Sequence, residues 1–457
     1  MFIEFSILFY FQEVFLMSIL IKDVTAITLN EENDILSNVD IAIEGNLIVS
    51  TGKLPEGFKP EMVIDGQNYI ALPAFFNSHC HSAMTLERSW AEDLPFDRWL
   101  NEKIWVAESA MEPEDVYRGS ALACCEMIRS GTVGFCDHYF YMDMVAKAVS
   151  ESGMKATLAW CQFGLGQDGE VGKKTFEDTL SFIREYHNSC EGRIKCVIGP
   201  HSPYMCPPDF LALVADKARE LNTGIHLHLS ESEEQVSVSM AKYGRSPVEH
   251  LLNTGVFDSH CISAHCISVS DEDIKILSEK GVYVAHTPKT YMKLAMGMSP
   301  LDKFLKGGVK VGLGTDGPAS NNDLNILEVM RLTGLVHKNL TGDPASFPND
   351  VILRLATGGS ASLMGFKDSG VIKEGAPADI ILFNRKKPYW TPCHDVKANI
   401  VYTSHPADIE YVICDGKLLL DKGNLTTLDE EKIMYEAEKR AFRMVGREMN
   451  LVRSYKG

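Results

Sequence analysis

The sequence predicts an α/β protein, namely a (β/α)8 TIM-like barrel with a composite β-sandwich domain formed from both chain ends. Two observations support this fold class. In the middle of the chain, strand-like apolar runs alternate with helical stretches eight times, whereas short strands and turns fill both ends. In addition, no Gly-x-Gly-x-x-Gly turn follows the first strand, which disfavours an open doubly wound sheet.

Composition limits the kind of partner. A chain of 457 residues with 45% hydrophobic residues can bury a large core. Its formal net charge of -18 disfavours nucleic acid and anionic membranes, because both reward Lys and Arg, and a small-molecule substrate fits better. Twelve cysteines without any Cys-x-x-Cys pair suggest neither a zinc ribbon nor a disulfide framework. We therefore expect a reduced, cytoplasmic protein.

The first residues do not continue this pattern. Residues 1–17 are apolar, but Glu4 and Glu13 interrupt them and no basic region precedes them. They are too short to span a bilayer and lack the charge pattern of a signal peptide. A strand pattern begins at Met17, so we expect the natural start there and a disordered or untranslated segment before it; a membrane anchor is the less favoured alternative.

The two chain ends together predict one domain. Each end carries short strands separated by Asn- and Gly-bearing breaks, and neither end is long enough to close a core alone. We expect residues 18–72 and 370–457 to form the composite β domain, including a C-terminal amphipathic helix. The expected strands are Ile19–Leu29, Asp40–Glu44, Leu47–Ser50, Ala378–Phe383 and the hairpin Ile409–Leu420, and the expected helix is Asp429–Ser454.

Residues 73–369 predict the barrel. Its first strand is the apolar run from Leu72 that leads to His79 and His81. In such barrels the catalytic residues lie at the C-terminal ends of the strands. The other seven expected strands are Thr132–Asp137, Ala156–Trp160, Ile194–Ile198, Gly224–Leu229, Cys261–Ala264, Val282–Ala285 and Val309–Leu313.

Polar residues follow several of these strands where the barrel rule predicts a site. A strand directs residues i and i+2 to the same side, so His79 and His81 converge. An isolated His-x-His is more often a pair of satisfied histidines, but here the pattern extends to further strand ends. Three imidazoles and one carboxylate would leave a coordination position for water on a single divalent cation, as in a catalytic site. The further residues are His201, His228, Glu231, His265 and Asp316.

These residues resemble the amidohydrolase superfamily, in particular its branch of 5'-methylthioadenosine/S-adenosylhomocysteine deaminases, with triazine and chloro-hydrolases as relatives. The resemblance covers the chain from about Ile19 onward. The branch-specific segments are Ser82-Ala-Met-Thr-Leu-Glu-Arg, Ala91-Glu-Asp-Leu-Pro-Phe-Asp-Arg-Trp-Leu100, Gly199-Pro-His-Ser-Pro-Tyr204, Gly314-Thr-Asp-Gly-Pro-Ala-Ser-Asn-Asn322 and Gly375-Ala-Pro-Ala-Asp-Ile380.

The resemblance implies a metal-dependent hydrolytic deaminase. It assigns His79, His81, His228 and Asp316 as ligands of one metal ion, Zn²⁺ first and Fe²⁺ as the alternative. No Lys ends strand four or five, where a carbamylated lysine would bridge a second metal. The resemblance also implies a homo-oligomer, either a dimer or a tetramer.

Roles of the catalytic residues follow from chemistry together with the resemblance. Deamination needs an activated water and a group that carries a proton to the leaving ammonia. Glu231 is the expected proton carrier and, by resemblance, protonates the ring nitrogen. Asp316 would act as general base, His265 would orient the attacking oxygen, and His201 would bind a purine ring nitrogen. His226 is expected to be a core histidine, and His138 and His286 are candidates for the layer behind the ligands.

The substrate side departs from the family. Glu108 matches the family residue that binds ribose hydroxyls, and Trp99, Leu100 and Trp105 are expected to wall an apolar pocket. Where relatives hold a carboxylate with arginines, this chain has Trp160 and the pair Lys173 and Lys174. Lysine is a looser match than the bidentate Arg fork. Relatives also carry Ser-Asn in place of Thr290-Tyr291.

We therefore expect deamination of an adenosine-type nucleoside, namely 5'-methylthioadenosine, S-adenosylhomocysteine or 5'-deoxyadenosine, with a neutral 5'-substituent favoured because Trp160 offers no charge. The main alternative is a deaminase or chlorohydrolase of another amino-heterocycle, such as a pterin, a guanine derivative or a triazine. A second class is a binding or scaffold protein that has lost the metal. The complete ligand set and Glu231 argue against that class.

Overall fold

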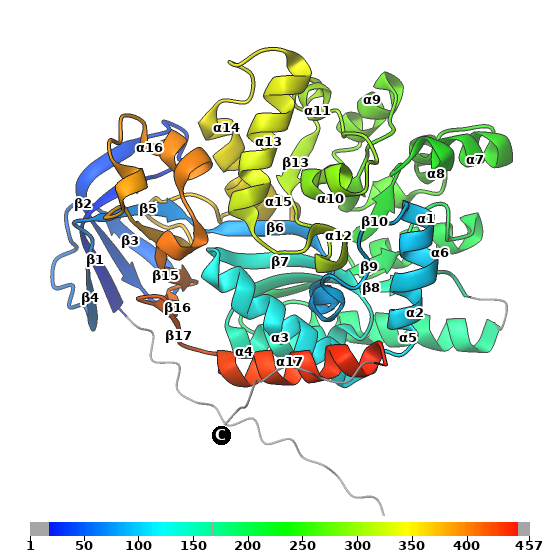
Figure 1. The fold of residues 1–457 in the computed structure, drawn as a ribbon, viewed down its shortest axis with the longest axis horizontal. Helices are drawn as coiled ribbons and strands as arrows, with labels where there is room; N and C mark the ends of the chain where they lie inside the picture. The colour runs from blue at the N-terminus through cyan, green and yellow to red at the C-terminus, as the bar shows by residue number, and fades with distance from the viewer. Residues whose placement is uncertain (1–17, 166–168, 447–457) are drawn as a thin grey trace, which may run out of the picture.

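The computed structural model describes residues 18–165 and 169–446 and contains two β-sheets (Figure 1). One sheet has eight strands in chain order from β6 to β13, and its strand pairs are parallel. The other sheet has nine strands contributed by both chain ends. The predicted fold class is confirmed: an α/β barrel carries a separate sheet built from the two ends of the chain.

The barrel strands are buried on both faces, because helices cover their outer side. Such strands contain near-continuous apolar runs, which is why the sequence pattern located them. The barrel strands are β6 (Phe75–Cys80), β7 (Thr132–Tyr139), β8 (Lys155–Gln162), β9 (Ile194–Pro200), β10 (Ile225–Leu229), β11 (Cys261–His265), β12 (Tyr283–His286) and β13 (Lys310–Leu313).

Helices follow the strands around the outside of the barrel (Figure 1). The helices up to the last barrel strand are α1 (Phe96–Trp99), α2 (Trp105–Glu108), α3 (Pro113–Arg129), α4 (Met142–Ser152), α5 (Gly169–Tyr186), α6 (Pro208–Glu220), α7 (Glu233–Tyr243), α8 (Pro247–Asn253), α9 (Asp271–Glu279), α10 (Pro288–Lys293) and α11 (Leu301–Gly307). Those after it are α12 (Pro318–Asn321), α13 (Ile326–Thr341), α14 (Asn349–Arg354), α15 (Ser360–Leu363), α16 (Val396–Ala398) and α17 (Glu430–Met444).

The first and last barrel strands meet through hydrogen bonds at their C-terminal ends. The Asn77 Nδ2 group donates to Thr315 Oγ1 over 2.7 Å, and the backbone N–H of Thr315 donates to Asn77 Oδ1 over 3.0 Å. The backbone N–H of Asp316 donates to the carbonyl of His79 over 2.9 Å. Closure of the barrel therefore brings Asp316 beside His79.

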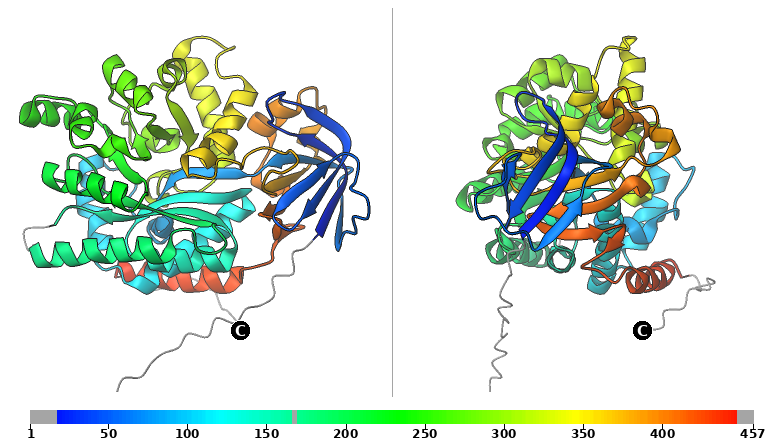
Figure 2. Two further views of the ribbon diagram at one scale, coloured as in Figure 1. Left: turned by 180° about the vertical axis from the view of Figure 1, so that it is seen from behind. Right: turned by 90° about the vertical axis from the view of Figure 1, so that its left-hand side faces the viewer.

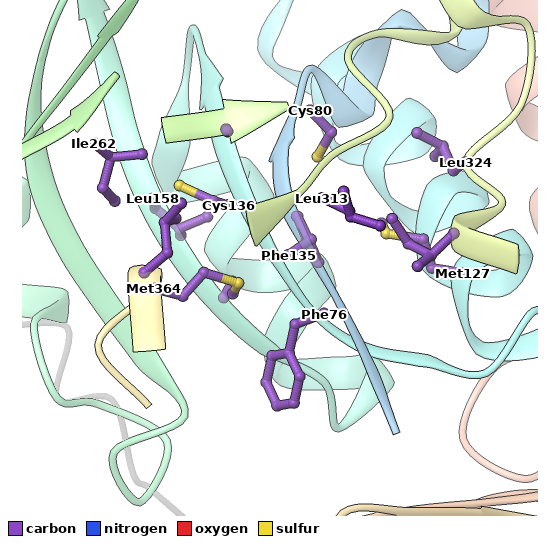
Figure 3. Close-up of a cluster of buried hydrophobic side chains, with 14 of the residues drawn as sticks. Phe76, Cys80, Met127, Phe135, Cys136, Leu158, Ile262, Leu313, Leu324 and Met364 are labelled. Atoms are coloured by element: carbon purple, nitrogen blue, oxygen red, sulfur yellow. The ribbon is translucent and has the colours of Figure 1, made fainter. Parts of the chain in front are cut away.

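The barrel core is apolar and continuous. Figure 3 shows side chains from several strands and from α3 in one buried cluster, among them Phe76, Phe135, Leu158, Ile262 and Leu313. Burial of apolar surface on this scale is the dominant favourable term in folding. It also provides a rigid support for the polar residues at the strand ends.

The second sheet joins strands that lie far apart in sequence. Its strand order is β17-β16-β15-β14-β5-β1-β2-β3, and β4 pairs with β1. The contact between the two chain ends is made by β14 against β5, which are antiparallel. These strands are β1 (Ser18–Ile27), β2 (Ile35–Glu44), β3 (Leu47–Thr51), β4 (Met62–Asp65), β5 (Tyr69–Pro73), β14 (Ile380–Asn384), β15 (Ile409–Cys414), β16 (Lys417–Asp421) and β17 (Asn424–Leu425).

Two details differ from the sequence prediction. The run from Leu72 was expected to be one barrel strand, but the chain forms β5 in the end sheet and then β6 in the barrel, with only Ala74 between them. Helix α17, expected as part of the β domain, instead lies along α3 of the barrel (Figures 1 and 2). Arg443 contacts the buried Asp115 of α3 by an ion pair.

Some predictions lie outside the described residues. This holds for the segment 1–17 and for the end of the predicted final helix beyond residue 446. In the part of the chain that the structure describes, no helix is both long and apolar enough to cross a membrane.

Candidate metal centre and active site

Four of the predicted site residues converge at the C-terminal end of the barrel. The Nε2 atoms of His79 and His81 lie 3.4 and 3.2 Å from Asp316 Oδ1. The Nε2 atom of His228 lies 3.4 Å from that of His81. Donor atoms of His79, His81 and His228 lie within 4.8 Å of one another, as do those of His79, His265 and Asp316. One cation can therefore be reached by residues from β6 and the position just after it, from β10 and from the segment after β13.

The hydrogen bonds of the imidazoles leave lone pairs facing the centre. Nδ1 of His81 donates to the carbonyl of His138 over 2.6 Å, and Nδ1 of His228 donates to the carbonyl of His201 over 2.9 Å. In the neutral rings both Nε2 atoms are then unprotonated, and they face each other and a carboxylate. Such a set of acceptors fits a divalent metal ion, which binds imidazole nitrogen and carboxylate oxygen.

His226 of β10 orients the imidazole of His79 from the barrel interior. The buried His226 places Nε2 at 2.8 Å from Nδ1 of His79. Nε2 of His79 itself has no hydrogen-bond partner among the described residues. A second hydrogen bond of this kind fixes the ring of a metal-binding histidine. His226 therefore supports the site from the barrel interior and does not face the centre directly.

Burial and the carboxylate of Asp316 act in opposite directions on the histidines of the centre. Burial lowers the pKa of His79 well below its usual value and that of His228 to about 4. Burial would also lower the pKa of His81, but the hydrogen bond with Asp316 outweighs it and raises this pKa to about 9. Burial would raise the pKa of Asp316, but His79 and His81 hold it well below its usual range. The Asp316 oxygen that faces His81 is of the kind that also binds a metal cation.

Glu231 and His265 lie beside the four convergent residues. Glu231 Oε1 accepts a hydrogen bond from the Tyr204 hydroxyl over 2.6 Å, and its Oε2 lies 3.9 Å from His265 Nε2. His265 and Asp316 both adopt left-handed backbone conformations, with φ of 76° and 65°. Such strained residues cluster at functional sites, where the surrounding structure holds them. The Ser320 hydroxyl donates to Asp316 Oδ2 over 3.0 Å.

A concave pocket opens at these residues, and several of them line it. Five residues predicted for the substrate side line it: Glu108, His201, Trp99, Leu100 and Trp105. The remaining lining is His81, Met84, Phe96, Ile104, His138, Tyr139, Phe140, Cys161, Phe163, Tyr204, His228, Glu231, His265, Thr290, Leu294, Met296, Asp316 and Ser320.

Two predicted substrate residues are held within this cavity by specific contacts. Glu108 Oε1 accepts a hydrogen bond from the Tyr139 hydroxyl over 2.6 Å. The ring of His201 stacks on Phe163 with centroids 4.9 Å apart, and its Nδ1 lies 3.0 Å from Ser202 Oγ. Burial lowers the pKa of His201 well below its usual value, so this ring is neutral and can exchange a hydrogen bond with a substrate nitrogen.

The prediction for Trp160 is wrong. Its indole packs edge-on against Phe182 of α5, with ring centroids 5.6 Å apart, and it is not among the described residues that line the cavity. The next residue, Cys161, lines it instead, because adjacent strand residues face opposite sides. Lys173 and Lys174 are exposed and also lie outside the described lining.

Sequence reasoning missed three side chains of the site. Tyr139 ends β7, Tyr204 lies in the loop after β9, and Ser320 lies in α12, which follows β13. Their position after barrel strands was a usable signal, but a hydroxyl does not by itself distinguish a site residue from an ordinary loop residue. Of the two candidate supporting histidines, His138 lines the cavity, whereas His286 pairs with His337 at an Nε2–Nε2 distance of 3.0 Å.

Comparisons with known proteins agree with this geometry. A 5-methylthioadenosine/S-adenosylhomocysteine deaminase from Pelotomaculum thermopropionicum is 46% identical over 434 residues, which is 94% of this chain and 100% of that protein. A zinc-bound adenosine deaminase from Xanthomonas campestris superposes with a TM-score of 0.89 at 27% identity, over 94% of this chain and 99% of its own. The zinc complex of atrazine chlorohydrolase from Arthrobacter aurescens gives 0.86 at 25% identity, over 93% and 100%. Residues 70–419 match the amidohydrolase family, and the chain belongs to that family.

Proposed function

We propose that this enzyme hydrolyses the exocyclic amine of an adenosine-type nucleoside, releasing ammonia and the inosine analogue. The observation that carries the proposal is the meeting of His79, His81, His228 and Asp316 at the floor of a cavity that also contains Glu108. The relatives named as deaminases of 5-methylthioadenosine and S-adenosylhomocysteine support the same reaction.

The four convergent residues would hold one divalent metal ion, and zinc suits their nitrogen and oxygen donors. When bound, such an ion lowers the pKa of water and so supplies a nucleophile at neutral pH. The shared Oδ1 contact of Asp316 with His79 and His81 fixes this carboxylate at the same point.

Proton movement is assigned to two residues of the chain, Asp316 and Glu231. Asp316 accepts a proton from the attacking water, and Glu231 delivers a proton to the ring nitrogen as the ring carbon becomes tetrahedral. Asp316 then passes its proton to the amine, the C–N bond breaks and ammonia leaves, while the hydroxyl proton of the intermediate returns to Glu231 as the carbonyl of the inosine analogue forms. Tyr204 holds Glu231 through Oε1, which leaves Oε2 on the side of His265. His265 orients the attacking oxygen.

Two residues orient the nucleoside. His201 would bind a purine ring nitrogen from its position against Phe163. Glu108 would accept the vicinal ribose hydroxyls, with Tyr139 donating to its other lone pairs. Hydrogen bonds to a charged acceptor contribute about 1.5–3 kcal/mol each, so the ribose would add substantially to selectivity.

The 5'-substituent should be neutral. The outer cavity wall contains Phe96, Ile104, Phe140, Leu294 and Met296, and no Lys or Arg occurs among the described residues that line the cavity. A carboxylate placed there would lose water without gaining a partner. The substrate class proposed is therefore 5'-methylthioadenosine or 5'-deoxyadenosine ahead of S-adenosylhomocysteine, for a reason independent of Trp160.

A substrate panel tests this function. Ammonia release is followed with protein reconstituted with Zn²⁺ or Fe²⁺, on 5'-methylthioadenosine, 5'-deoxyadenosine, S-adenosylhomocysteine, guanine, a pterin and an amino- and a chlorotriazine. We expect the highest kcat/KM for the two neutral nucleosides. A higher value for a free heterocycle or for chloride release would contradict the nucleoside assignment. Size-exclusion chromatography of the same preparation tests the predicted dimer or tetramer.

A further inference from the structure

The turn after β11 holds His265 in a strained backbone conformation. The backbone N–H of Cys266 donates to the carbonyl of Ala264 over 3.1 Å, and His265 between them has a φ of 76°. A hydrogen bond from residue i+2 to residue i around such a φ is typical of the rare, strained form of the γ-turn. A residue other than glycine keeps this conformation only where the surrounding structure fixes it. The groups that fix His265 therefore also determine how its ring faces the site.

Two buried residues that follow β12 bind His265, one by its backbone and one by its ring. The Tyr291 hydroxyl donates to the backbone carbonyl of His265 over 3.3 Å and accepts from the backbone N–H of Thr287 over 3.0 Å. The Thr287 hydroxyl lies 3.2 Å from Nδ1 of His265. Thr287 and Tyr291 are both 0% exposed. These three contacts link the three residues in one closed ring.

This ring of contacts selects which side of the imidazole faces the site. Because Thr287 engages Nδ1 of His265, Nε2 remains, and it lies 3.9 Å from Oε2 of Glu231. The ring of Tyr291 also packs edge-on against the imidazole, with centroids 5.8 Å apart. Neither Thr287 nor Tyr291 is among the described residues that line the cavity. Their effect on the reaction therefore passes through His265 rather than through direct contact with a substrate.

We propose that Thr287 and Tyr291 are positioning residues for the reaction, which hold His265 in its strained turn and so direct its Nε2 toward the attacking oxygen. This inference rests on the proposed function, because that function gives His265 its role. Misplacement of a reacting group by about 1 Å can lower a rate about 100-fold, so hydrogen bonds that fix this turn affect turnover.

Steady-state kinetics test this role on 5'-methylthioadenosine, or on whichever substrate of the panel is turned over fastest. Tyr291→Phe and Thr287→Val each remove one hydroxyl and keep the shape of the side chain. We expect each to lower kcat about 3- to 30-fold with KM within about twofold, because neither side chain contacts the substrate. The double variant should lose at most about twofold more than the less active single variant, since both hydroxyls hold one residue.

The matched control is Tyr283→Phe. Tyr283 is a buried tyrosine at the start of β12, and its hydroxyl lies 3.2 Å from Ser362 Oγ. This variant also removes one buried hydroxyl from the barrel, but that hydroxyl has no contact with His265 among the described residues. We expect its kcat to stay within about twofold of wild type.

Hydrogen–deuterium exchange gives a readout that needs no turnover. The peptide that contains His265, Cys266 and Ile267 should exchange faster in Tyr291→Phe than in wild type, because the turn loses a contact. In Tyr283→Phe the exchange of this peptide should be unchanged. The zinc content after reconstitution should equal that of wild type in Tyr291→Phe, because His265 is not among the four proposed ligands.

Several results would overturn the proposal. These are a wild-type kcat in Tyr291→Phe, unchanged exchange of the His265 peptide, losses that multiply in the double variant, and an equal loss of kcat in Tyr283→Phe. A zinc content that falls together with kcat would assign the effect to the metal ligands instead. If wild type turns over a heterocycle but no nucleoside, the proposed function fails, while both measurements on Tyr291 can still be made and remain a separate result.

Discussion

The two ends of the barrel both bury charged groups, but only the N-terminal end satisfies them from within. There, Lys155 Nζ lies 2.6 Å from Asp379 Oδ2 and 2.7 Å from Asp415 Oδ1, and the Ser369 hydroxyl donates to Asp379 over 2.7 Å. At the C-terminal end, imidazole nitrogens and Asp316 Oδ1 lie within 3.4 Å of their neighbours, and Ser320 donates only to the other carboxylate oxygen. The first arrangement joins the barrel to the end sheet, and the second is where the proposed cation and substrate would bind. A cluster whose buried charges are paired by other groups of the protein thus stabilises the fold, whereas a cluster that lacks such pairing is a candidate functional site.

The largest expected effect is at the functional end. Glu231→Gln should lower kcat for ammonia release by about 10²–10⁴-fold, the range for a lost general acid–base group. Metal content and Tm should stay close to wild type, because the glutamine carbonyl can still accept from Tyr204. Glu233→Gln, at an exposed position on α7, is the matched control and should retain activity within about twofold. Near-wild-type turnover in Glu231→Gln would remove this residue from the mechanism.

The stabilising end should show the opposite pattern. Lys155→Met leaves Asp379 and Asp415 buried without their cation, and breaking a buried ion pair in this way costs about 3–5 kcal/mol of unfolding free energy. Activity per folded molecule should be unchanged. Lys195→Met is the control: Lys195 lies over Phe366, and its ammonium makes no ion pair with the described residues. Denaturant unfolding of both variants checks this, and an equal loss in the two would refute the distinction.

Acid should weaken the histidine-rich end first. Burial lowers the pKa of His337 to about 4 and that of its partner His286 well below 6.5. At mildly acidic pH these two histidines therefore bind protons in the unfolded chain but not in the folded chain. The stability from these groups is complete above pH 6.5 and is lost as the pH falls toward 4, by about 1.4 kcal/mol per pH unit for each histidine. Unfolding free energy measured against pH should fall less steeply in His337→Gln; an unchanged slope would refute this origin.

The smallest effect tests the orientation of Asp316. Ser320→Ala removes the donor to Asp316 Oδ2 and should lower kcat by about 3- to 10-fold, since hydrogen bonds of this type contribute about 1–2 kcal/mol. Ser278→Ala removes a surface hydroxyl that donates to the Gly307 carbonyl and serves as the control. If both variants have the wild-type kcat, the hydrogen bond from Ser320 to Asp316 Oδ2 does not contribute to catalysis.

The sequence predicted most of the fold because the barrel strands are apolar runs with polar ends. The same property explains the Trp160 error: both faces of β8 are buried, so apolarity does not reveal which residues face the cavity. The split between β5 and β6 was missed because an apolar run continues through Pro73 and Ala74 while the pairing partners change.

The pairing of β5 with β14 also constrains the order in which the chain can fold during synthesis. Residues Tyr69–Pro73 receive their partner Ile380–Asn384 only about 300 residues later. At a translation rate of about 5–20 residues per second, β5 stays without this partner strand for roughly 15–60 s. Unpaired apolar edges invite association between chains. We therefore expect newly made chains to be most prone to association in this interval, and a circular permutation that places β14 directly before β1 should shorten it.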